Sequence, residues 1–122
     1  MLRATLGTDP ALGVTRPAGS HIQAVVWQAL LTFFLMLVIS AVATDRGAVG
    51  EPAALAIGGA VTLGALVGGP ITGGSMNPAR SLGPALIAGE LETVWIYIVG
   101  PVIGAVAAAL TSDFLRDGRR WV

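Results

Sequence analysis

The sequence predicts an all-α membrane protein with three membrane-spanning helices and one re-entrant half-helix. Three long apolar runs are typical of bilayer spans, and charged residues make up only 11% of the chain, against about 25% in soluble domains. Mean hydropathy is +0.78. A polar segment containing Arg80 and a helix start interrupts the apolar sequence. At 122 residues the chain is too short to bury three such runs in water, so we expect lipid to surround them.

The three expected spans are residues 22–44, 53–69 and 94–112. None of them contains a charged residue, and the charges gather where the runs stop. The second run is at the lower length limit for a span. Rows of small residues recur every four positions, which favours close approach of helix backbones in lipid. These rows are Ala56, Ala60, Gly64 and Gly68 in the second run, and Gly100, Gly104 and Ala108 in the third.

A half-helix is expected at residues 77–88. Asn77 is a good N-cap, and Pro78 suits the first helical position because it has no N–H to leave unpaired. The helix would be about 16 Å long, roughly half of a hydrocarbon core of about 30 Å. Arg80 would lie one turn inside it, at a cost that favours a pore or binding site over plain hydrocarbon. The competing interpretations are an ordinary helix cap for Asn77 and a snorkelling or paired surface arginine for Arg80.

Composition excludes several function classes. The chain has no cysteine and one histidine, so we expect no disulfide, no metal site and no cofactor. Because it also lacks paired carboxylates in a polar pocket, we expect no catalytic residues and no enzyme activity. The net charge is zero, which argues against a nucleic-acid partner. The first twenty residues have no apolar core run and do not resemble a signal peptide.

The arginine distribution predicts a cell-membrane protein with a cytoplasmic C-terminus. Arg116, Arg119 and Arg120 follow the last run, and Arg46 lies in a loop on the same side. Residues 1–21 are then an extracellular connecting segment, residues 22–114 the membrane domain, and residues 115–122 a cytoplasmic tail.

The segment from Gly73 to Ala85, Gly-Gly-Ser-Met-Asn-Pro-Ala-Arg-Ser-Leu-Gly-Pro-Ala, resembles the second signature loop of the aquaporin family, the major intrinsic proteins. Residues 69–72, 95–105 and 32–46 also match the family pattern. The resemblance covers about residues 3 to 115. Within the family, the sequence is most similar to the nodulin-26-like branch and to the bacterial glycerol and metalloid channels.

The resemblance implies one repeat of a two-repeat fold. A complete member resembles two inverted repeats, each with three spans and a half-helix opened by Asn-Pro-Ala, and this chain matches the second. One repeat cannot enclose the pore, so a complementary first half is expected as a partner. A homotetramer is expected if the channel is complete.

The resemblance also implies site residues. Asn77, Pro78 and Ala79 would form the pore signature, and Ala65, Gly74 and Arg80 would contribute to the selectivity filter. The backbone of Thr72, Gly73, Ser75 and Met76 would line the path. Gln28 occupies the place of a glutamate that braces this loop in family members, and its amide keeps hydrogen bonding but loses charge assistance.

The implied function is passive transport of water or small uncharged solutes through the lipid bilayer. Because Ala65 and Gly74 are small, glycerol, urea or metalloid hydroxides would fit better than water alone. The alternative is a truncated fragment that inserts in the membrane and conducts nothing. A membrane enzyme is not supported, because the sequence offers no catalytic nucleophile paired with a general base.

Overall fold

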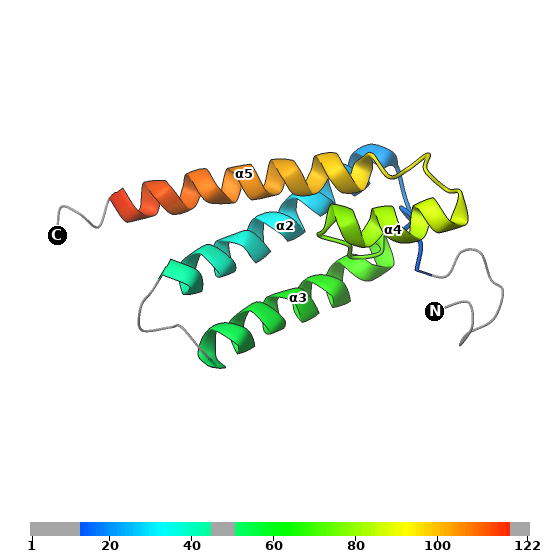
Figure 1. Ribbon diagram of the computed structural model, residues 1–122. Helices are drawn as coiled ribbons and strands as arrows, with labels where there is room; N and C mark the ends of the chain where they lie inside the picture. Colours follow the sequence, from blue (N-terminus) through cyan, green and yellow to red (C-terminus); the bar gives the residue numbers. More distant parts are fainter. Residues whose placement is uncertain (1–12, 45–50, 118–122) are drawn as a thin grey trace.

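The computed structural model describes residues 13–44 and 51–117, and these form four α-helices and no strand (Figure 1). The helices are α2 (His21–Thr44), α3 (Glu51–Thr72), α4 (Pro78–Ala88) and α5 (Ile96–Asp117). The three longer helices are long and apolar enough to cross a membrane, and α4 has half their length. The predicted fold class of three spans and one half-helix is therefore confirmed.

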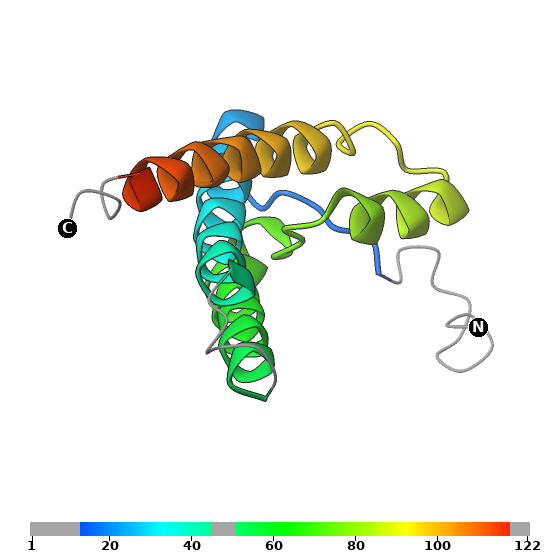
Figure 2. The same cartoon turned by 60° about the vertical axis from the view of Figure 1, so that its left-hand side comes forward.

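Helix α2 is the centre of the arrangement. It packs most extensively against α5 and less extensively against α3, while α4 touches α5. Figure 2 shows α5 crossing α2, with α4 on the far side of the crossing from the C-terminus. The end of α2, the start of α3 and the end of α5 lie at one end of the molecule, and α4 lies at the other.

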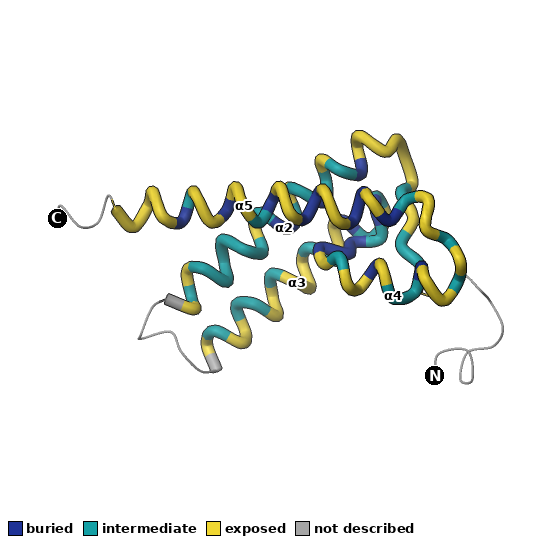
Figure 3. The backbone as a smooth tube through the Cα atoms, turned by 45° about the horizontal axis from the view of Figure 1, so that its top comes forward, coloured by how far each residue is buried: buried dark blue, intermediate teal, exposed yellow. Residues whose placement is uncertain are grey.

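The buried residues gather where α2, α5 and the segment between α3 and α4 meet (Figure 3). Ala24, Ile96 and Tyr97 form the apolar part of this core. Large apolar side chains elsewhere face outward; Leu55 is 77% exposed and Phe114 is 79% exposed. Helices that are apolar on every face suit a lipid environment.

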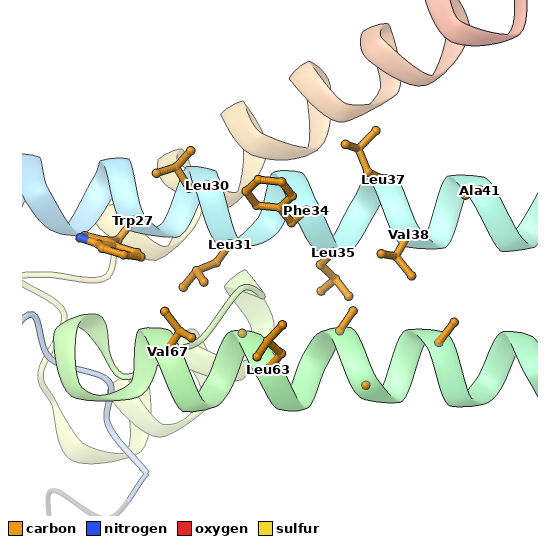
Figure 4. Close-up of a pocket in the computed structure, with 14 residues that line it drawn as sticks. Trp27, Leu30, Leu31, Phe34, Leu35, Leu37, Val38, Ala41, Leu63 and Val67 are labelled. Carbon is orange, nitrogen blue, oxygen red and sulfur yellow. The ribbon is translucent and has the colours of Figure 1, made fainter.

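An apolar groove of about 770 Å³ separates α2 from α3 along much of their length. Figure 4 shows Leu31, Leu35 and Val38 facing Leu63 and Val67 across it. The lining is almost entirely hydrocarbon, so the groove offers little to orient a polar solute.

Two helices are longer than the apolar runs predicted. Helix α3 continues past residue 69 through Pro70 to Thr72. The proline removes one helical hydrogen bond only two residues before the helix ends, where the loss matters little. Helix α5 begins at Ile96 after a turn and continues past residue 112 to Asp117, because polar residues can extend a helix beyond an apolar run.

Glycines allow the close contact between α5 and α2. A Cβ atom on Gly104 would lie 2.2 Å from the Ala29 carbonyl oxygen, and one on Gly100 would lie 2.7 Å from the Gln28 Cβ. Both distances are too short for any real side chain. This row of small residues in the third run therefore sets how closely the two backbones approach.

Gly104→Ala should lower the stability of the chain by about 1–3 kcal/mol, because the helices must separate to admit the methyl group. Gly58→Ala is the matched control, since a Cβ there meets nothing within 4 Å and helix propensity favours alanine. The measurement is the thermal unfolding midpoint in detergent micelles. Equal midpoints for the two variants would contradict the proposed packing.

Candidate functional site

The segment between α3 and α4 is a buried loop with an unusual backbone. Gly73, Gly74 and Met76 have φ values of 79°, 57° and 52°. Glycine adopts this left-handed region freely, but for Met76 it is strained. Met76 is only 6% exposed, and its sulfur would lie 2.6 Å from a Cβ added at Gly64. Strain at Met76 therefore persists because surrounding contacts hold the residue in place.

Gln28 of α2 braces this loop. Its side chain is fully buried, and its Oε1 accepts the Met76 backbone N–H at 2.9 Å. Its Nε2 donates to the Thr72 hydroxyl at 2.7 Å. The Thr72 hydroxyl donates to the Gly68 carbonyl at 3.2 Å, so it can accept the hydrogen bond from Gln28 at the same time. A neutral amide is well suited here because it supplies one donor and one acceptor without burying a charge.

Helix α5 holds the same loop from another side. The Tyr97 hydroxyl donates to the Thr72 backbone carbonyl at 2.8 Å, and the Tyr97 side chain is 1% exposed. The last turn of α3 is therefore fixed by both α2 and α5. Sequence reasoning did not single out Tyr97, whose local sequence gives no sign of a partner 25 residues earlier.

Helix α4 starts as its sequence predicts. Asn77 caps the helix with an extended backbone, and its Oδ1 accepts the Ala79 N–H at 2.9 Å. Pro78 is the first helical residue, and Gly89 ends the helix in a left-handed conformation. Asn77 and Ala79 are exposed on this side of the chain. The positive end of the helix dipole thus lies at the exposed tip.

Arg80 folds back from the first turn of α4 onto the loop. Its Nη1 donates to the Gly74 carbonyl oxygen at 3.3 Å. Gly74 in turn packs against α3, where its Cβ would lie 3.2 Å from the Ala65 Cα. The structure therefore brings together the predicted filter residues Ala65, Gly74 and Arg80. A side chain at position 74 would crowd the α3 backbone and would need a left-handed φ of 57°, which explains the glycine there.

The four residues predicted to line a path with their backbone are packed within the chain. Thr72, Ser75 and Met76 are buried, and Gly73 is half-buried. The Thr72 and Gly74 carbonyls already accept hydrogen bonds from Tyr97 and Arg80. Their role along a path stays a prediction.

Hydroxyl groups link the loop to α4 and to the segment before α2. Ser75 donates to the Asn77 carbonyl at 2.8 Å, and Ser81 donates to Ser75 at 2.6 Å. Thr15 lies 2.6 Å from the Ser81 hydroxyl. The sequence analysis did not identify the contact between Thr15 and Ser81, because the two residues are 66 positions apart and no local pattern links them.

Two further contacts attach residues 13–20 to this end of the molecule. The Ala18 N–H donates to the Ile71 carbonyl at 2.9 Å. Arg16 forms a two-pronged ion pair with Glu90, with Nε to Oε2 at 2.9 Å and Nη2 to Oε1 at 2.5 Å. Both side chains are largely exposed, so this pair contributes at most about 1 kcal/mol.

Within residues 13–44 and 51–117, no group of three or more acidic or histidine side chains is arranged to hold a metal ion. The polar chemistry of the described site is hydrogen bonding from amides, hydroxyls and one guanidinium. Such a site can orient small polar molecules at the exposed tip of α4.

Residues 3–112 match the family model described as Major intrinsic protein. Aquaporin NIP1-1 of Oryza sativa subsp. japonica is 57% identical over 102 residues, which cover 84% of this chain and 36% of the relative. Nodulin-26 of Glycine max is 50% identical over 111 residues, which cover 91% of this chain and 41% of the relative. Aquaporin NIP1-2 of Arabidopsis thaliana is 49% identical over 102 residues, or 84% and 35%. The chain thus spans between 35% and 41% of the length of these relatives.

Gln28→Leu should destabilise the chain by about 2 kcal/mol or more, because the buried Met76 N–H and the Thr72 hydroxyl lose their partner. Gln28→Glu should cost less, since a carboxylate still accepts from Met76 and the Thr72 hydroxyl can turn to donate to it. Gln23→Leu, on an exposed position of the same helix, is the control. Unfolding midpoints in detergent test the order, and a loss at Gln28→Leu no larger than at Gln23→Leu would refute the bracing role.

Proposed function

Because the chain belongs to the major intrinsic protein family, as its signature loop predicted, we propose that it supplies one half of a membrane channel. The channel conducts water and small uncharged solutes such as glycerol, urea or metalloid hydroxides. The observation that carries the proposal is the exposed, capped tip of α4, with Arg80 held one turn inside it. Side chains from two spans hold the strained loop before α4 in place. An ordinary helix cap does not require such a rigidly held loop.

Asn77 is the residue that meets the solute. Its Oδ1 is engaged with the Ala79 N–H, and its side-chain amide group is at the exposed tip. A passing water or hydroxyl receives a hydrogen bond there. The positive end of the α4 dipole repels protons and cations at the same point. Pro78 and Ala79 keep the tip narrow and without competing polar side chains.

Arg80 and its neighbours form part of the selectivity filter. The guanidinium supplies hydrogen-bond donors and a fixed positive charge, and its bond to the Gly74 carbonyl limits its movement. Ala65 and Gly74 add almost no bulk beside it. A filter with two small residues admits solutes wider than water, which favours glycerol-sized molecules.

The proposal includes the partners and the orientation. A first repeat supplies the opposite wall of the pore and the opposing half-helix. The finished channels assemble as a homotetramer, as the family resemblance implies. The C-terminus is cytoplasmic, so residues 13–20, the α4–α5 turn and the Arg16–Glu90 pair lie at the outer mouth.

The alternative is a chain that inserts in the membrane and conducts nothing. The exposed tip of α4 and the open face of the loop then meet lipid or another copy of the chain. Polar groups left without partners in hydrocarbon cost several kcal/mol each, so such a chain should self-associate.

Arg80→Ala should enlarge the filter and weaken cation rejection when the chain is reconstituted with a first repeat. Stopped-flow light scattering of proteoliposomes gives water and glycerol permeability, and a pH-sensitive dye gives the proton leak. We expect glycerol permeability to rise relative to water, with a measurable proton leak. Arg116→Ala is the control: Arg116 lies in the last turn of α5 and donates to the Ser40 carbonyl of α2, and its replacement should change neither the solute ratio nor the proton leak.

The same assay separates the two functions. The chain alone and the first repeat alone should give no flux above empty vesicles, whereas the pair should conduct. If the pair also conducts nothing, the non-conducting alternative is correct. If the pair conducts and Arg80→Ala leaves the solute ratio unchanged, Arg80 is not part of the filter.

A further inference from the structure

A chain of three hydroxyl groups runs from the segment before α2 into the loop, and its direction is fixed. Ser75 gives its one hydroxyl hydrogen to the Asn77 carbonyl, and Ser81 gives its hydrogen to Ser75. Ser81 therefore has no hydrogen left for Thr15, so Thr15 is the donor in the remaining contact. Each hydroxyl therefore donates to the next, and Thr15 is the first donor.

The hydroxyl chain fixes the frame that holds Arg80. Ser75 directly follows Gly74, whose carbonyl accepts from the arginine, and Ser81 directly follows Arg80 itself. The bond between the two serine hydroxyls at 2.6 Å therefore sets the distance between the arginine backbone and its acceptor. Ser75 is 2% exposed and Ser81 is 1% exposed, so water does not replace a missing partner easily.

Thr15 contacts this frame through both branches of its side chain. Its hydroxyl reaches Ser81 at the start of α4. Its Cγ2 methyl lies against Gly73, where an added Cβ would be 3.1 Å away. Thr15 therefore contacts both Gly73, which follows α3, and Ser81, in the first turn of α4. The nearby Ala18 to Ile71 backbone bond keeps the segment in register for this contact.

We propose that Thr15 is a positioning residue of the filter: its hydroxyl completes the hydrogen bonding of Ser81 and Ser75 and thereby holds Arg80 at the geometry that selects the solute. This inference rests on the proposed channel function. It assigns a selectivity role to the segment that precedes the first span, outside the signature loop. Thr15 touches no solute and acts through Ser81.

Three variants isolate the hydroxyl. Thr15→Val keeps the shape and the methyl contact with Gly73 but removes the donor. Thr15→Ser keeps the donor and loses the methyl group. Thr111→Val is the matched control, because Thr111 lies on α5 with its hydroxyl on the Ala107 carbonyl of its own helix.

The first readout needs no transport. Hydrogen–deuterium exchange of the whole chain in nanodiscs reports the protection of the Met76 and Ala79 amides, which are bonded to Gln28 and Asn77. In Thr15→Val we expect exchange of residues 73–80 to become about fivefold faster, because the buried Ser81 hydroxyl loses the hydrogen bond that it accepts and the loop loosens. Thr15→Ser and Thr111→Val should exchange as the unchanged chain does. Unaltered exchange in Thr15→Val overturns the proposal.

The second readout is selectivity in the channel reconstituted with a first repeat. Thr15→Val should change the glycerol-to-water permeability ratio by about threefold or more, and Thr15→Ser should restore it. A purely structural role would lower both permeabilities together and leave their ratio unchanged, which contradicts filter positioning.

The two proposals fail in different ways. If the unchanged pair conducts nothing, the channel function fails, and the exchange experiment still decides whether Thr15 holds the loop. If the pair conducts, Arg80→Ala shifts the solute ratio and Thr15→Val does not, then the channel function stands and the positioning role of Thr15 is wrong.

Discussion

The structure depends on one constraint, which is that backbone N–H and C=O groups at membrane depth must find partners. Helices satisfy this requirement internally, but the loop leaves the helical path after the Gly73 N–H, which still donates to the Gly69 carbonyl, and loses those bonds up to Asn77. Gln28 supplies an acceptor to the Met76 N–H, and Ser75 supplies a donor to the Asn77 carbonyl. The loop keeps a fixed conformation because side chains replace the helix as its hydrogen-bonding partner.

Close helix packing follows from the same requirement. Gln28 reaches the loop only if α2 is near it, and the glycines at positions 100 and 104 let α5 approach the α2 backbone without a side chain between them. Tyr97 then reaches the Thr72 carbonyl from α5. The outward faces of the helices are mainly apolar, and hydroxyls there such as Thr62 and Thr111 bond to carbonyls of their own helix.

Local patterns predicted the elements, and tertiary contacts decided the rest. The Asn77-Pro78 pair predicted the start of α4 because capping depends on adjacent residues alone. Helix α3 continues three residues past the predicted span at 53–69, and the side-chain bonds that hold Thr72 there come from α2 and α5. The Gln28 brace was expected from the family resemblance, whereas the Thr15 contact joins residues too far apart in sequence for any local pattern to reveal.

The central claim is that α4 is a re-entrant half-helix whose tip lies deep in the membrane while its base lies near the surface. The chain contains no cysteine, so Ala79→Cys and Leu91→Cys can each carry a single spin label. Electron paramagnetic resonance depth measurements with oxygen and a water-soluble nickel complex should place the label at residue 79 about 10 Å or more deeper than the label at residue 91, in keeping with the rise of α4. Equal depths, with both labels near the surface, would contradict the account.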